Sequence, residues 1–144
     1  MIRCKGGDLA DALNTLSLPD DALIFVANPD VADEWSAVSK ELTEAFELSQ
    51  AAVRNNGPVM YVVEGDDLLG RNGTGRAMVA CGLLSAARTL ALETARSGVP
   101  VNVVAIGNAS IELTGLWVET LCRPNGPNGE LIRLGVDHLG KALP

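Results

Sequence analysis

Aromatic side chains are scarce in this sequence, which has two tryptophans, two phenylalanines and one tyrosine among 144 residues. A chain with so few flat rings offers little surface for stacking nucleobases. Positive charge is scarce as well, because 11 lysines and arginines stand against 18 aspartates and glutamates, for a formal net charge of -7. Since nucleic-acid-binding proteins usually carry a basic face, we expect no nucleic-acid partner.

Cysteine and histidine are too few and too scattered for a metal site or a disulfide framework. Cys4, Cys81 and Cys122 lie far apart without a CxxC pair, which is typical of reduced thiols in the cytoplasm. The one histidine, His138, is interpreted as a solvated surface residue. The N-terminus lacks the apolar core of a secretory signal, and no charge-free stretch is long enough to span a bilayer. We therefore expect a cytoplasmic protein with no metal and no membrane partner.

Apolar residues are abundant, at 47% of the chain, and they are organised in short runs and long periodic segments. The runs "ALIFVA" (22–27), "PVMYVV" (58–63) and "VNVVAI" (101–106) are continuous, as in parallel strands that are buried on both faces. The single tyrosine, Tyr61, falls inside the second run and is interpreted as a core or sheet-face residue. The amount of apolar sequence suits one domain over residues 1–144.

Two long segments between these runs are predicted to be helices, at residues 31–54 and 76–97. The first has one apolar stripe, formed by Trp35, Val38, Leu42, Ala45, Phe46, Ser49 and Val53. Its other side is left for water, with Glu34, Lys40, Glu41, Glu44 and Glu47. The second is apolar around most of its circumference, which is typical of a helix covered on two sides.

Strand, helix, strand, helix, strand in this order predicts parallel strands joined by right-handed crossovers. The fold class is therefore α/β, a Rossmann-like three-layer sandwich with a small, mostly parallel sheet. Residues 1–5 are expected to form an edge strand and residues 8–16 a short helix. Towards the C-terminus we expect a strand at 113–121, a turn-rich connection at 123–130 and a closing helix at 131–143.

The segment "RTLALETARSGVPVNVVAIGN" (88–108) resembles the short-chain dehydrogenase/reductase family. In that family a helix ending in a leucine, alanine and glutamate pattern is followed by a "GIRVNAVAPG"-like strand. The matching positions are Leu90, Ala91, Leu92, Glu93, Gly98, Val101, Asn102, Val104, Ala105 and Gly107. With "DALIFVAN" similar to the family's "DVLVNNAG" strand, the resemblance covers residues 21–108.

This resemblance also implies what the chain lacks. The family's TGxxxGxG dinucleotide turn needs an N-terminal βαβ half, and this chain begins too late to contain it, so we expect a truncated relative. Counting back from Glu93, the family's tyrosine falls on Arg76, its lysine on Ala80, its serine on Val63 or Glu64, and its asparagine on Leu42 or Glu41. None of the four catalytic residue types is present, and alanine or valine cannot transfer a proton. We expect a non-catalytic assembly or binding subunit without a cofactor. The alternative is an NAD- or NADP-dependent oxidoreductase with a site rebuilt on Arg76 or Glu64.

Two polar features are weighed as binding sites. In the glycine-rich loop at residues 70–75, the amides of Gly73, Thr74 and Gly75, with Arg71 and Arg76, would form an anion or nucleotide site at a helix N-terminus. The favoured interpretation is a flexible connection, because lone glycine patterns are weak signals and acidic residues precede the loop. The second feature, the cluster Glu64, Asp66 and Asp67, is compatible with a metal, but a solvated loop is favoured.

Helix pairing is the expected mode of assembly. Small residues along 76–97 permit close approach of another helix, and large apolar faces are rarely left exposed. We expect a homodimer or higher homo-oligomer through the two long helices, or pairing with an active reductase, with an interface near Trp35, Phe46, Met78, Cys81 and Ser85. The edge of the strand at 22–27 must also be covered, by residues 1–5, the C-terminal segment or a second subunit.

Overall fold

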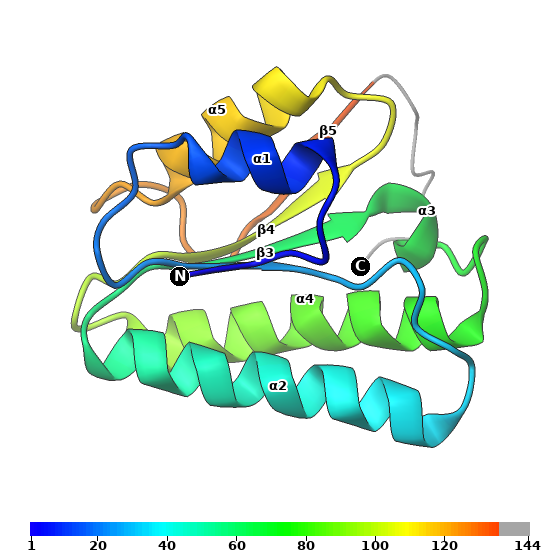
Figure 1. Ribbon diagram of the computed structural model, residues 1–144. Coiled ribbons are helices and arrows are strands. Elements are labelled where there is room, and N and C mark those ends of the chain that lie inside the picture. The colour runs from blue at the N-terminus through cyan, green and yellow to red at the C-terminus, as the bar shows by residue number, and fades with distance from the viewer. Residues whose placement is uncertain (136–144) are drawn as a thin grey trace.

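The computed structural model describes residues 1–135 and contains one sheet with helices on both faces (Figure 1). The five strands are all parallel and stand in the order β1-β2-β3-β4-β5. Their bounds are β1 Ile2–Arg3, β2 Leu23–Val26, β3 Val59–Glu64, β4 Val101–Ile106 and β5 Leu131–Leu134. The predicted α/β, Rossmann-like architecture with a small parallel sheet is confirmed.

The helices divide between the two faces of the sheet, with α1 and α5 on one face and α2 and α4 on the other (Figure 1). A short α3 follows β3 directly. The bounds are α1 Asp8–Asn14, α2 Trp35–Arg54, α3 Gly65–Leu68, α4 Thr74–Thr94 and α5 Ile111–Leu121. Both long helices were predicted, although α2 begins four residues later than expected.

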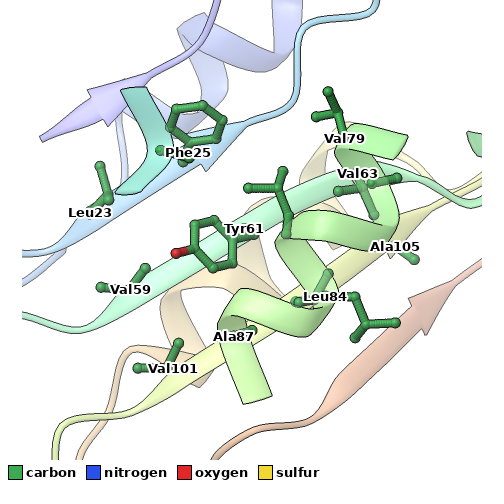
Figure 2. Packing of buried hydrophobic residues seen from close by; sticks show 14 of the residues in the cluster. Leu23, Phe25, Val59, Tyr61, Val63, Val79, Leu84, Ala87, Val101 and Ala105 are labelled. Carbon is green, nitrogen blue, oxygen red and sulfur yellow. The ribbon is translucent and has the colours of Figure 1, made fainter. Parts of the chain in front are cut away.

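The three apolar runs form the centre of the sheet because their alternate side chains are buried on opposite faces. On the α4 side, Tyr61 and Phe25 meet edge to face, with ring centroids 6.3 Å apart. Figure 2 shows these rings among the aliphatic side chains of β2, β3, β4 and α4. Tyr61 is thus a core residue, as predicted.

The faces on which the helices lie determine the hands of the crossovers. Every connection moves one strand in the same direction across the sheet, yet α1 and α5 lie opposite α2 and α4. The crossovers through α1 and α5 must therefore have the opposite hand from the other two. Right-handed crossovers, which were predicted and are the general preference, can therefore occur only on one face of the sheet.

The N-terminal strand β1 pairs with the edge of β2, the strand whose partner could not be predicted uniquely from the sequence. Ile2 and Arg3 pair in parallel with Ile24 and Phe25, and the Met1 carbonyl accepts a hydrogen bond from the Ile24 amide at 2.9 Å. Of the three predicted partners for the strand at 22–27, residues 1–5 are the ones that pair with it.

Two predictions after residue 107 are wrong. The expected strand at 113–121 is the helix α5, because Ser110 caps it by accepting a hydrogen bond from the Leu113 amide at 3.1 Å. The expected helix from residue 131 begins as the strand β5, which pairs with β4 over four residues. The rest of that prediction, and His138, lie outside the described residues. The predicted turn-rich connection at 123–130 is confirmed.

One described helix, α4, is long and apolar enough to cross a membrane, by length and composition alone. Core helices of globular domains often meet the same criterion, and here 39% of the most apolar window is buried within the fold. Met78 and Leu92 are the large apolar side chains that α4 leaves exposed.

Candidate functional site

The sheet has two topological switch points, which are the places where neighbouring strands are followed by helices on opposite faces. Ligands in open α/β sheets bind at such points, outside the carboxyl ends of the strands. The first lies between β1 and β2 and the second between β3 and β4. We call them the first crevice and the second crevice.

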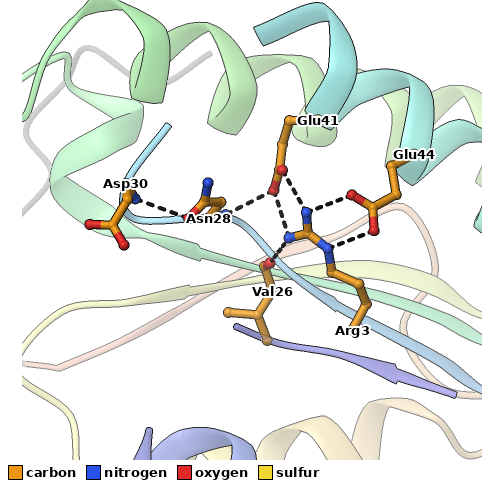
Figure 3. A network of polar contacts seen from close by, with 6 residues as sticks. All are labelled: Arg3, Val26, Asn28, Asp30, Glu41 and Glu44. Atoms are coloured by element: carbon orange, nitrogen blue, oxygen red, sulfur yellow. Dashed lines mark hydrogen bonds and ion pairs between the residues drawn. The ribbon is translucent and has the colours of Figure 1, made fainter. Parts of the chain in front are cut away.

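The first crevice has two cavities, of about 710 and 200 Å³, which share Cys4 and Lys5 in their walls. Arg3 lines the larger cavity, and Figure 3 shows the network of polar contacts around it. The Arg3 guanidinium donates to Glu41 at 2.6 and 2.7 Å, to Glu44 at 2.7 and 3.1 Å and to the Val26 carbonyl at 3.0 Å. It also lies 4.4 Å from the centre of the Phe25 ring. All of its donors are therefore used within the chain.

The charges of this network stabilise one another. Burial opposes the charged form of Arg3, but the hydrogen bonds to Glu44 and Glu41 outweigh it and raise the pKa of the guanidinium. The same hydrogen bond lowers the pKa of Glu44. Glu41 is buried and also accepts from the Asn28 amide at 2.9 Å. The prediction that Glu41 faces water is wrong, because helical periodicity cannot reveal a partner 38 residues away.

The glycine-rich loop at residues 70–75 is shaped by close packing against the loop that follows β2. Gly73 has φ of 116°, a conformation that favours glycine. A Cβ on Gly75 would lie 2.4 Å from the Ala32 carbonyl oxygen. The amide of Gly75 donates to the Asp33 carboxylate at 2.6 Å, so a carboxylate of the chain occupies the amide that an external anion would use.

The predicted carboxylate cluster is divided between ion pairs and one unpaired residue. Asp67 is buried and lies 2.8 Å from Arg76 Nε, a contact that is an ion pair by distance but not directed as a hydrogen bond. Arg76 Nη2 does donate to Asp67, at 3.1 Å. Asp66 pairs with Arg71 at 2.7 Å on the surface. No group of three or more histidines, cysteines or carboxylates suited to a metal ion occurs within residues 1–135.

Glu64 ends β3 and lines both the smaller cavity of the first crevice and the second crevice. The second crevice is a cavity of about 290 Å³, whose walls also include Asn108 and Arg133. Burial raises the pKa of Glu64, and Asp67 and Asp66 add to the shift, while Arg76 acts against it. A half-buried carboxyl with a raised pKa at the carboxyl end of a strand is typical of functional sites.

The surface formed by α2 and α4 holds a groove of about 370 Å³. Its floor has a buried polar pair, in which Ser49 donates to the Ala45 carbonyl at 2.6 Å and so accepts from the Tyr61 hydroxyl at 2.7 Å. The five predicted interface residues divide over the two helices, and all five are exposed: Trp35, Phe46, Met78, Cys81 and Ser85. Phe46 and Ser85 line the groove itself.

Comparison with solved structures relates this arrangement to known enzymes. Acetoin dehydrogenase from Enterobacter cloacae superposes with a TM-score of 0.68 and 17% identity over 79% of this chain and 62% of its own. An oxidoreductase of the short-chain dehydrogenase/reductase family from Burkholderia thailandensis gives 0.65 and 19% over 87% and 66%. Enoyl-[acyl-carrier-protein] reductase (NADH) from Aquifex aeolicus VF5 gives 0.63 and 16% over 87% and 67%. The fold is that of the short-chain dehydrogenases.

The likeness is one of fold, because no family model matches the sequence and no curated protein matches it either. The chain spans 62% and 65% of the length of two of these dehydrogenases, the acetoin dehydrogenase and a 3-hydroxyacyl-CoA dehydrogenase type-2 from Mycobacterium avium. The predicted similarity to the short-chain dehydrogenase fold is confirmed.

The positions that the resemblance aligns with catalytic residues have structural surroundings in this chain. Arg76 lies in the first turn of α4 and is held by Asp67. Ala80, one turn later, is fully buried, and Val63 is buried in the sheet. Leu42 packs over Gly82, and a Cβ on Gly82 would lie 2.9 Å from the Leu42 side chain. Among the aligned positions, Glu64 differs from the others. Its carboxyl group lines a cavity and forms no ion pair with another described residue.

Three features of this end of the sheet were not predicted from the sequence. Arg3 and Asp33 bond to partners more than 35 residues away, which no local pattern reveals. The third, a glycine pair at Gly6 and Gly7, was visible as a strand, turn and helix sequence in "IRCKGGDLADAL". Both glycines have positive φ, at 87° and 83°, but acidic residues occupy the first turn of α1, which disfavours a phosphate there.

Proposed function

We propose that this chain is a non-catalytic, short-chain dehydrogenase-like subunit that assembles with a second copy through the surface of α2 and α4. The observation that carries the proposal is the apolar character of that surface. Trp35 and Phe46 are 66% and 60% exposed, and Met78 and Leu92 on α4 are exposed as well. Large exposed apolar patches mark interaction sites.

The charge distribution favours a second copy of this chain as the occupant. The chain carries a formal charge of -7, so two copies repel each other over most of their surfaces. Among the residues that line the α2 and α4 groove, Glu93 is the one formal charge. The small residues Gly82 and Ala86 line the groove together with Phe46, whose large side chain is 60% exposed. A surface with both a projection and a recess suits an isologous twofold contact.

The absence of catalysis is supported by what surrounds the aligned positions. A tyrosine and lysine pair at positions 76 and 80 would need to reach a substrate. Here the chain has Arg76, bound to a buried aspartate, and Ala80, which is fully buried. Neither offers a titratable donor for a carbonyl.

The assembly is tested by measuring mass in solution for the wild type and two matched variants. We expect a dimer for the wild type and a monomer for Phe46→Glu, because a charge would be buried in the contact. Leu116→Glu is the control, since Leu116 is 63% exposed on α5 of the opposite face. A monomeric wild type, or equal effects of the two substitutions, would contradict the proposal.

A second candidate function is an NAD- or NADP-dependent oxidoreductase with a rebuilt site, and Glu64 is the observation that favours it. Its half-buried carboxyl lies at the carboxyl end of β3, where the resembled enzymes place a serine. The smaller cavity of the first crevice that Glu64 lines measures only about 200 Å³, which is small for a cofactor. Saturable quenching or enhancement of NADH or NADPH fluorescence would support this candidate over the first.

The remaining alternative is an anion-binding module at the glycine loop. It would require an anion to compete with Asp33 for the Gly75 amide. Phosphate would then raise the melting temperature of the wild type, and Arg76→Ala would remove that effect.

A further inference from the structure

The second crevice contains two opposite charges that are unmatched among the described residues, 1–135. Glu64 stands at the end of β3 and Arg133 on β5, and both line the same cavity of about 290 Å³. Within residues 1–135, neither side chain makes a hydrogen bond or an ion pair. Glu64 is half-buried and Arg133 is exposed at the mouth of the cavity. A half-buried carboxyl without a partner is unusual, because partly buried charges are generally paired.

The neighbouring charges show how local this imbalance is. Asp66 pairs with Arg71, and Asp67 with Arg76, so these four charges cancel in pairs. Arg76 lowers the pKa of Glu64 through electrostatic attraction alone. This effect is smaller than the opposing effects of burial and of the Asp67 charge. Lys5 lines the adjoining cavity that Glu64 also lines, and among the described residues the two form no ion pair. One negative and one positive charge therefore remain, at separate places on the cavity wall.

The strand register holds the two charges apart. Arg133 is opposite Ala105 of β4, and Ala105 is opposite Val63 of β3. Arg133 thus projects on the face of Val63, whereas Glu64 is the next residue along β3 and points to the other face. The two side chains reach the cavity from opposite faces of the sheet, across its carboxyl edge.

We propose that the second crevice binds a small zwitterion, such as an amino acid, with its ammonium group on Glu64 and its carboxylate on Arg133. A simple anion would be repelled by Glu64, and a simple cation by Arg133. A molecule with both charges satisfies both groups and leaves the net charge unchanged. The carboxylate would accept two parallel hydrogen bonds from the guanidinium. At about 290 Å³ the cavity lies close to the lower end of the range for small-molecule pockets, which suits a small ligand.

Binding is tested on the full chain by calorimetric titration with glycine, β-alanine and 4-aminobutyrate, which differ in the spacing between their charges. Acetate and methylammonium at equal ionic strength are the single-charge probes. We expect saturable binding of at least one zwitterion and at least tenfold weaker binding of both single-charge probes. Glu64→Gln and Arg133→Gln should each weaken zwitterion binding about tenfold or more, which corresponds to about 1.4 kcal/mol.

Matched controls separate this site from general charge effects. Glu47→Gln on α2 and Arg96→Gln beyond α4 remove exposed charges far from the cavity, and they should leave binding unchanged. The proposal is overturned if no zwitterion binds saturably, if acetate alone binds as tightly as the zwitterions, or if the controls weaken binding as much as the crevice variants. Neither crevice residue lies on the α2 and α4 surface, so this test and the assembly test fail independently.

Discussion

The two crevices of the sheet differ in whether their charged side chains are paired. In the first, the buried charges are matched by the chain itself, because Arg3 is bound by Glu41 and Glu44. In the second, Glu64 and Arg133 line one cavity without meeting. A matched network fixes the structure around it, whereas unmatched charges are free to interact with a ligand. Position at a switch point therefore does not by itself make a binding site, and the pairing of the charges there distinguishes the two.

The largest effect is expected from breaking the network of the first crevice. Arg3→Ala would leave Glu41, whose side chain is 5% exposed, as an unpaired buried charge. We expect a loss of about 3 to 5 kcal/mol in the free energy of unfolding, measured with urea. The control is Arg71→Ala, which removes a surface pair that is more than half exposed on both sides and should cost at most about 1 kcal/mol. Similar losses for the two variants would show that the network of the first crevice is not structural.

An intermediate effect is expected at the contact that joins the loop after β2 to the start of α4. Asp33→Ala removes the acceptor of the Gly75 amide and should lower the free energy of unfolding by about 1 kcal/mol, as for the loss of a helix cap. Asp30→Ala is the control, because Asp30 is exposed and accepts no hydrogen bond through its side chain from another described residue. If both substitutions were neutral, the loop would not be held by this carboxylate.

The smallest effect should have the opposite sign, and it belongs to the second crevice. The pKa of Glu64 is raised in the folded state. Between its pKa in the unfolded chain and its pKa in the folded state, the folded protein therefore holds more of the proton at Glu64 than the unfolded chain does. Its ionisation therefore lowers stability as the pH rises through the raised pKa. Glu64→Gln should increase the free energy of unfolding at pH 7 by less than about 1 kcal/mol, because solvent screens the charge of a half-exposed carboxyl.

This gain should disappear below the ordinary pKa of a glutamate, about 4.3, because the wild-type carboxyl is then neutral in both states. Urea unfolding at both pH values measures it, and Glu47→Gln, on exposed α2 surface, is the control. A loss of stability at pH 7 would mean that Glu64 is matched like Arg3, and the contrast between the crevices would fail. A gain in stability together with a loss of zwitterion binding would identify a charge retained at the expense of stability.

The sequence was sufficient to predict what depends on nearby residues. Continuous apolar runs predicted β2, β3 and β4, and the spacing of residues such as Val38 and Ala45 predicted α2. Local signals also misled, because Trp117 and Val118 suit a strand by their residue type, yet they lie in α5 behind the Ser110 cap. The site was harder to predict, since Glu41 and Arg133 have roles set by β1 and by the register of β5, which only the folded sheet defines.

The order of the strands also has a consequence for how the sheet forms. Each strand pairs only with the strand before it and the strand after it in the chain, so no strand has to wait for a distant partner. We expect the six-residue pairing of β3 with β4 to form early, with β2 and β5 adding to it by closing loops of moderate length. The two-residue β1 offers the shortest pairing and is expected to join last. In that order the sheet would grow outward from its middle, and Arg3 would close one edge only after the rest is in place.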